Sequence, residues 1–171
     1  MRSIRGFFQA MFCICALAVP GQGASAQETT PAFALTLSGG TRNRASTDFR
    51  IGSTIWITIM QTNKTSDSID CTEIAKNGIN ISYHYEVTDE DGKSAKTVTR
   101  PHMDTEPQDV HPCNLAAGES LTGEEEINDL FKLDRPGKYT VQVWRWDPDT
   151  KDSDGNPVKV YSNTITITIT G

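Results

Sequence analysis

The chain of 171 residues lacks the short motifs by which most enzymes are identified from sequence. It has no Gly-x-Ser-x-Gly, no His-Glu-x-x-His, no Cys-x-x-Cys and no glycine-rich phosphate loop. Its three histidines, His84, His102 and His111, have no sequence neighbours that would complete a catalytic triad. We therefore predict that the protein is not an enzyme and uses no cofactor.

The chain also lacks a hydrophobic run long enough to cross a membrane. The longest apolar stretch, Phe7 to Val19, has 13 residues, whereas a spanning helix needs about 20. Arg2 and Arg5 precede this stretch, and Ala24-Ser25-Ala26 follows it, which is the layout of a secretory signal peptide cleaved before Gln27.

The predicted cleavage divides the chain into a signal peptide, residues 1–26, and a single domain, residues 27–171. We expect the product to be secreted or periplasmic, with no membrane span after cleavage. It carries 14 basic and 22 acidic residues, a net charge of −8, and no basic cluster in its sequence. This charge argues against nucleic acid as a partner.

Cysteine is scarce, and only Cys71 and Cys113 remain after the predicted cleavage. An exported protein with two cysteines is expected to pair them. The bond would close a loop of about 40 residues and stabilise the fold by roughly 4 kcal/mol in the chain-entropy model. Two free thiols in loops are the alternative.

Short alternating strands separated by turn residues fill most of the sequence, and no amphipathic helix is convincing. This pattern predicts an all-β, Ig-like β-sandwich of about seven antiparallel strands with one disulfide, and a closed barrel is the alternative. The predicted strands are residues 33–37, 53–61, 79–88, 93–99, 120–127, 139–146 and 161–170.

The inward-facing positions of these strands predict the core. Three consecutive acids, Glu124 to Glu126, suggest that their strand lies at a sheet edge. Tyr139 is either the tyrosine of a tyrosine corner, with its hydroxyl bonded back near Leu133 or Asp134, or a simple core aromatic. The predicted core residues are Leu35, Leu37, Ile55, Ile57, Ile59, Ile81, Tyr83, Tyr85, Val87, Tyr139, Val141, Val143, Ile165, Ile167 and Ile169.

Four segments match a recognisable layout of strands and turns. Ile51-Gly52-Ser53 opens an Ile-rich strand, residues 85–93 form a strand and turn, Ala117-Gly118-Glu119-Ser120-Leu121 opens another strand, and Pro136-Gly137-Lys138-Tyr139 leads the penultimate one. This layout resembles bacterial secreted Ig-like domains and is similar to the intracellular proteinase inhibitor (BsuPI-like) type. The resemblance implies the Ig-like fold and, in the inhibitor type, proteinase inhibition.

Two acidic segments contain residue types that bind metal ions. A histidine-containing loop has spacing that matches no established site, so we predict a solvated polar loop and no metal. The acidic turn 147–155 ends in Asp-x-Asp-Gly but has no EF-hand ligand pattern, so we expect a soluble hairpin turn, with calcium binding at the hairpin tip as the alternative. The ligand candidates in the first loop are His102, Asp104, Glu106, Asp109 and His111.

Trp144 and Trp146 alternate with Val141 and Val143 and should therefore face outwards, beside His84 of a neighbouring strand. Exposed tryptophans would form a surface for a partner. The alternative is that the segment containing Pro148, Pro157 and Val158 folds over them.

The favoured function is a non-catalytic, secreted or periplasmic binding or accessory domain of unknown ligand, with a protein partner in the envelope or outside the cell. The alternative is a secreted proteinase-inhibitor-like domain that acts through the proline-stiffened 100–112 loop, since rigid loops lose less entropy on binding. A purely structural accessory domain is a third reading.

Overall fold

The computed structural model describes residues 29–42, 44–99 and 107–171. The predicted signal peptide lies outside these residues. None of the helical structure in the described part of the chain is long and apolar enough to span a membrane.

The described residues form fourteen strands and one short 3-10 helix, Ile127–Asp129. The strands are β1 (Phe33–Thr41), β2 (Arg44–Ala45), β3 (Asp48–Arg50), β4 (Trp56–Asn63), β5 (Ile69–Asp70), β6 (Glu73–Lys76), β7 (Ile79–Asn80), β8 (His84–Asp89), β9 (Asp109–His111), β10 (Asn114–Leu115), β11 (Ser120–Glu126), β12 (Gly137–Lys151), β13 (Pro157–Tyr161) and β14 (Ile165–Thr170).

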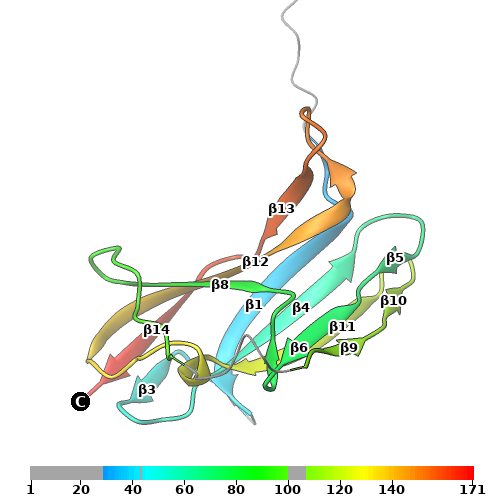
Figure 1. Cartoon of the computed structure of the whole chain (residues 1–171). Coiled ribbons are helices and arrows are strands. Elements are labelled where there is room, and N and C mark those ends of the chain that lie inside the picture. Colours follow the sequence, from blue (N-terminus) through cyan, green and yellow to red (C-terminus); the bar gives the residue numbers. More distant parts are fainter. Residues whose placement is uncertain (1–28, 43, 100–106) are drawn as a thin grey trace, which may run out of the picture.

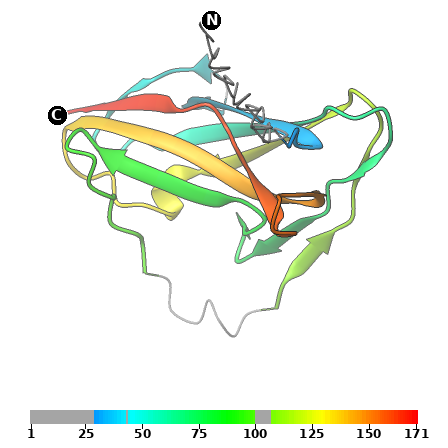
Figure 2. The same ribbon diagram turned by 90° about the horizontal axis from the view of Figure 1, so that it is seen from above.

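Two main sheets form an all-β sandwich (Figure 1). The first sheet has the order β11-β4-β1-β2, and its neighbours are antiparallel. The second sheet is built on β12, which pairs with β8 along one edge and with β13 and then β14 along the other. Figure 2 shows β14 (red), β12 (gold) and β8 (green) side by side. One pairing, β14 with β3, is parallel, whereas the sequence predicted antiparallel strands only.

Smaller sheets are attached to the sandwich near the disulfide. β10 pairs with β5, and β6 lies between β7 and β9. Cys71 and Cys113 form the predicted disulfide, 42 residues apart in sequence, and the Cys71 N–H donates to the Cys113 carbonyl at 3.1 Å. The bond therefore joins the segments that carry these small sheets.

The core lies between the main sheets, and twelve of the fifteen predicted core residues are buried in it. Ile165 and Tyr85 are half-buried against the core. Ile81 is half-buried, because the predicted strand 79–88 is interrupted by a turn between β7 and β8. Buried residues outside the predicted set include Phe33, Phe49, Ile69, Leu115, Ile127, Phe131, Leu133 and Val160.

Other predictions have mixed outcomes. The acidic strand β11 lies at the edge of its sheet as predicted. Residues 93–99 do not form a strand, and only Ser94 and Thr97 make isolated bridges. The predicted strand 161–170 is divided, because Ser162, Asn163 and Thr164 separate β13 from β14.

Asn163 explains this division, since its side chain pairs with the backbone of the opposite sheet. Its Oδ1 accepts from the Leu37 N–H at 2.7 Å, and its Nδ2 donates to the Leu37 carbonyl at 3.0 Å. The amide thus substitutes for a strand residue and ties β1 to the second sheet.

Tyr139 has both predicted roles. It is buried in the core, and its hydroxyl donates to the Arg135 carbonyl at 3.2 Å. The bond reaches Arg135, one residue beyond the predicted Leu133 or Asp134.

Asp147 is fully buried near the C-terminal end of β12 and binds the segment just before β1. One carboxylate oxygen, Oδ2, accepts from the Ala32 N–H at 2.7 Å. The other, Oδ1, accepts from the Asp149 and Thr150 N–H groups at 3.1 and 3.2 Å. Charge-assisted bonds to backbone donors offset the cost of burying this charge.

We predict that Asp147→Ala lowers the free energy of unfolding by roughly 3 kcal/mol, because it leaves the Ala32 N–H without its acceptor. Asp149→Ala is the matched control, since Asp149 is exposed and contributes only its backbone N–H to this network. It should change stability by less than about 0.5 kcal/mol. Urea unfolding of both variants measures the difference, and equal losses would contradict the assignment.

Candidate functional site: an aromatic cluster on β8, β12 and β13

The outer face of the second sheet carries a row of aromatic side chains. Val141 and Val143 of β12 point into the core and are fully buried, so Trp144 and Trp146 fall on the alternate positions. The sheet register sets His84 of β8 opposite Trp144 on one side and Tyr161 of β13 opposite it on the other. Two residues further along the same strand pair, Lys159 of β13 lies opposite Trp146. We call His84, Trp144, Trp146, Lys159 and Tyr161 the aromatic cluster.

Trp144 is the covered centre of the cluster. The His84 ring stacks on it with centroids 3.8 Å apart and planes 9° apart. The Lys159 Nζ lies 4.0 Å from its centroid, a cation–π contact. Its indole Nε1–H donates to Glu86 Oε1 at 2.8 Å. Trp144 is consequently only 9% exposed.

Trp146 and Tyr161 are the open members of the cluster. Trp146 is 44% exposed and Tyr161 is 47% exposed. The Trp146 ring meets Trp144 edge-on, at 5.3 Å and 87°, and the Tyr161 ring lies 6.1 Å from Trp144 at a tilt of 44°. Lys159 also lies 5.1 Å from the Trp146 centroid. Two rings thus face solvent, held by a buried one.

The structure brings together the three residues predicted from sequence, His84, Trp144 and Trp146. The predicted exposure holds for Trp146 and is wrong for Trp144, which His84 and Lys159 cover. Sequence reasoning missed Lys159 and Tyr161. Their alternation with the apolar Val158 and Val160 was the available signal, but it required the pairing register of the hairpin.

The acidic turn after β12 is a structured hairpin end. Asp152 Oδ1 accepts from the Asp154 and Asn156 N–H groups, both at 2.9 Å. The Asp147 carboxylate accepts hydrogen bonds from three backbone N–H groups. In the part of the chain that the structure describes, no three His, Cys, Asp or Glu side chains are grouped closely enough to hold a metal ion.

The 100–112 loop, proposed from sequence for inhibition, is described only from residue 107 onwards. His102, Asp104 and Glu106 of the metal-ligand candidates lie outside the described residues. Asp109 and His111 are exposed on β9, which pairs with β6.

A polar group lies inside the sandwich between β4 and β12. Arg145 donates to Gln61 Oε1 at 3.0 Å and to the Thr72 carbonyl at 2.7 Å. The Tyr83 hydroxyl lies 3.3 Å from Gln61 Oε1 and 3.4 Å from Glu73 Oε1. Gln61 Nε2 has no hydrogen-bond partner among the described residues. These contacts anchor β12 to β4 and β6.

Burial and negative charge keep the nearby phenols protonated. Burial first, and then the Glu73 carboxylate, raises the pKa of Tyr83 to about 12. Burial, followed by the Glu125 carboxylate, raises the pKa of Tyr85 as well. Both phenols are therefore part of the interior and are neutral at physiological pH.

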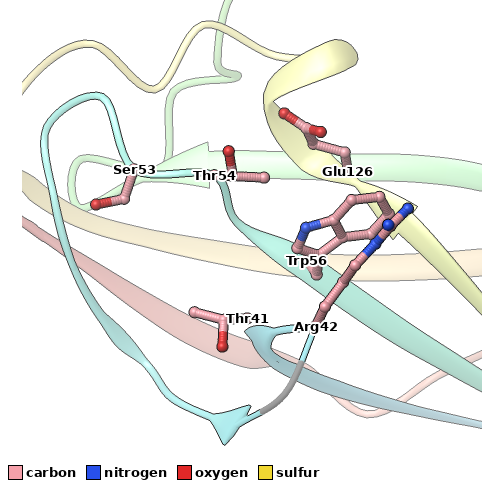
Figure 3. A pocket seen from close by; sticks show the side chains of 6 residues that line it. All are labelled: Thr41, Arg42, Ser53, Thr54, Trp56 and Glu126. Atoms are coloured by element: carbon pink, nitrogen blue, oxygen red, sulfur yellow. The ribbon is translucent and has the colours of Figure 1, made fainter.

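Figure 3 shows a separate hollow lined by Trp56 of β4, Glu126 of β11 and Arg42. The Arg42 Cζ lies 4.3 Å from the Trp56 centroid. This cation–π contact places the guanidinium over the aromatic face of Trp56.

We predict that the two tryptophans differ in their effect on stability. Trp144→Ala should lower the free energy of unfolding by roughly 3 kcal/mol, because it empties the covered centre of the cluster. Trp146→Ala should cost less than about 1 kcal/mol, because its ring already faces water. Urea unfolding checks this, and equal losses would place both rings in the packed interior.

We also predict a loss of stability at alkaline pH. A phenol whose pKa is raised by folding contributes stability below about pH 10, and this contribution is lost as the pH rises through the folded pKa. For Tyr83 the window is about pH 10 to 12, and the loss is roughly 2 kcal/mol. Urea unfolding across this range should show a smaller decline for Tyr83→Phe than for the wild type, and parallel declines would contradict the assignment.

Comparisons with known proteins give no family. No protein-family model matches the chain, and no curated protein matches it. The X-ray structure of Northeast Structural Genomics Consortium target SoR45 is 11% identical, with 82% of this chain and 89% of that chain covered and a TM-score of 0.43. The C-terminal domain of Wzt is 8% identical, with 84% and 76% covered and a TM-score of 0.48.

A third solved structure, Pseudomonas fluorescens alkylpurine DNA glycosylase AlkC bound to DNA containing an abasic site analog, is 10% identical, with a TM-score of 0.41. The alignment covers 82% of this chain and 31% of that chain. All three similarities are too distant to carry an argument about function, so the aromatic cluster has to be judged on its own geometry.

Proposed function

We propose that the protein is a non-catalytic, secreted or periplasmic Ig-like domain that binds another protein through its aromatic cluster. The observation that carries the proposal is the exposure of Trp146 and Tyr161, which lie at diagonal positions of the β12–β13 pair and both contact Trp144. Tryptophan and tyrosine are the residues most enriched among those that dominate the energy of protein interfaces.

The packing beneath these rings supports a binding surface. Trp146 rests edge-on against Trp144, which is itself fixed by His84 and by the hydrogen bond to Glu86. A surface that is already ordered loses little conformational entropy when a partner binds. Lys159 and Glu86 add one charge of each sign, as in the polar rim of an interface.

Two features support export and the Ig-like assignment. The Cys71–Cys113 disulfide fits an oxidising compartment, as the predicted signal peptide does. The Tyr139 bond to Arg135 just before the penultimate main strand resembles a tyrosine corner.

The test is affinity capture from the envelope and secreted fractions, followed by titration calorimetry with the purified partner. We expect Trp146→Ala/Tyr161→Ala to weaken binding at least about 30-fold, or roughly 2 kcal/mol, while urea unfolding shows an intact fold. The control Met60→Ala/Val110→Ala removes two exposed apolar side chains elsewhere and should bind like the wild type.

The outcome also separates the alternatives. A captured protease that binds both double variants equally would overturn the aromatic-cluster proposal and favour inhibition through another surface. If every captured partner that is not a protease binds the Trp146→Ala/Tyr161→Ala variant as tightly as the wild type, the aromatic-cluster proposal is overturned and the structural accessory role is favoured.

A further inference from the structure

A hollow of about 210 Å³ lies at the end of β12 opposite to the aromatic cluster. It is lined by Lys93, Lys96, Lys132 and Arg135, with Tyr139 from the start of β12, and we call it the basic hollow. In Figure 1 the turn after β8 and the segment leading into β12 lie together at this end of the sheet. The basic hollow is therefore separate from the aromatic cluster.

Backbone hydrogen bonds fix the segments that carry these cations. The Lys132 N–H donates to the Lys96 carbonyl at 2.8 Å, and Thr97 forms an antiparallel bridge with Phe131. On the other side, the Ala95 N–H donates to the Val87 carbonyl of β8 at 2.8 Å. The lysines thus project from a strand-like frame and not from a free loop.

This frame sets like charges against each other. The antiparallel bridge places Lys96 directly opposite Lys132, an arrangement that is destabilising in a sheet. No hydrogen bond or ion pair joins the side chains of Lys93, Lys96, Lys132 or Arg135 to any described residue. The two lysine side chains repel each other in the folded protein, and a bound anion between them would reduce this repulsion.

The charge of the hollow contrasts with that of the whole protein. Residues 27–171 have a net charge of −8 and only 14 basic residues, yet four of these line one hollow. The lining contains two carboxylates, Asp89 and Asp134, so its net charge is +2. Asp89 Oδ1 is already used by the turn, where it accepts from the Asp91 and Lys93 N–H groups.

We propose that the basic hollow binds a phosphoryl group in its dianionic form. The charge of a phosphate monoester dianion matches the net charge of the lining, and its oxygens accept the donors that lysine and arginine present. A volume of about 210 Å³ corresponds to roughly seven water molecules, which suits a small anionic group and is less than the space a drug-sized ligand needs.

The probe is inorganic phosphate at about pH 8, where it is mostly dianionic, added to the full exported protein at an ionic strength held constant with sodium chloride. Amide shifts in a ¹⁵N-labelled sample report the site. We expect saturable shifts at residues 93–96 and 132–135, with a Kd on the order of 1 mM. Shifts that do not saturate, or that chloride alone reproduces, would overturn the proposal.

Charge-neutralising variants test the geometry. Lys96→Gln and Lys132→Gln should each weaken phosphate binding roughly fivefold, and the double variant should abolish it. The matched control is Lys151→Gln, which removes the same charge from the exposed far end of β12 and should bind like the wild type. Equal weakening by all three would mean general charge attraction and would overturn the site.

The lysine variants are expected to remain folded, so a loss of phosphate binding would not reflect unfolding. Removing one of two opposed lysines should leave the free energy of unfolding unchanged or raise it slightly, and urea unfolding verifies this. Vesicles of phosphatidylcholine with phosphatidic acid distinguish the source of the phosphoryl group. Vesicle binding that the double lysine variant loses supports a lipid headgroup, and phosphate binding without vesicle binding supports a soluble ligand.

Discussion

The backbone pairing of β12 is the constraint on which the rest of the structure depends. Residues 137–151 form one strand that hydrogen-bonds to β8, β13 and β14. Because β12 is 15 residues long, its two ends lie in different parts of the molecule. Tyr139 packs at one end beside the basic hollow, and Trp146 is exposed near the other. Both candidate surfaces therefore share one rigid element, and their relative position is set by strand geometry.

Polar side chains complete the backbone pairing where the strands stop. Asn163 pairs with Leu37 through both atoms of its amide. Asp147 accepts the Ala32 N–H just before β1, and Asn63, buried at the end of β4, donates to the carbonyls of Leu115 and Ala116. Such groups cost free energy to bury unless each is satisfied, so these positions define the register of the sandwich as strictly as the apolar core does.

The sequence predicted the fold well because alternation depends on neighbours along the chain. Ile167 and Ile169 are buried as their spacing with threonine indicated. Residues 79–88 were mispredicted because alternation continues through a turn that the tertiary structure imposes. The aromatic cluster was found in part, since Trp144 and Trp146 are close in sequence, whereas Tyr161 joins them only through pairing. The basic hollow was not found at all, because two segments far apart in the sequence, residues 93–96 and 132–135, contribute its cations.

The disulfide has a consequence for the integrity of the molecule. It links Cys71 to Cys113 and so encloses β6, β7, β8 and β9 in a covalent ring. A protease that cuts once anywhere inside this ring leaves both pieces of the chain attached to each other. The nicked protein would migrate as one species on a non-reducing gel and as two on a reducing gel, and the aromatic cluster and the basic hollow would stay on one molecule after cleavage.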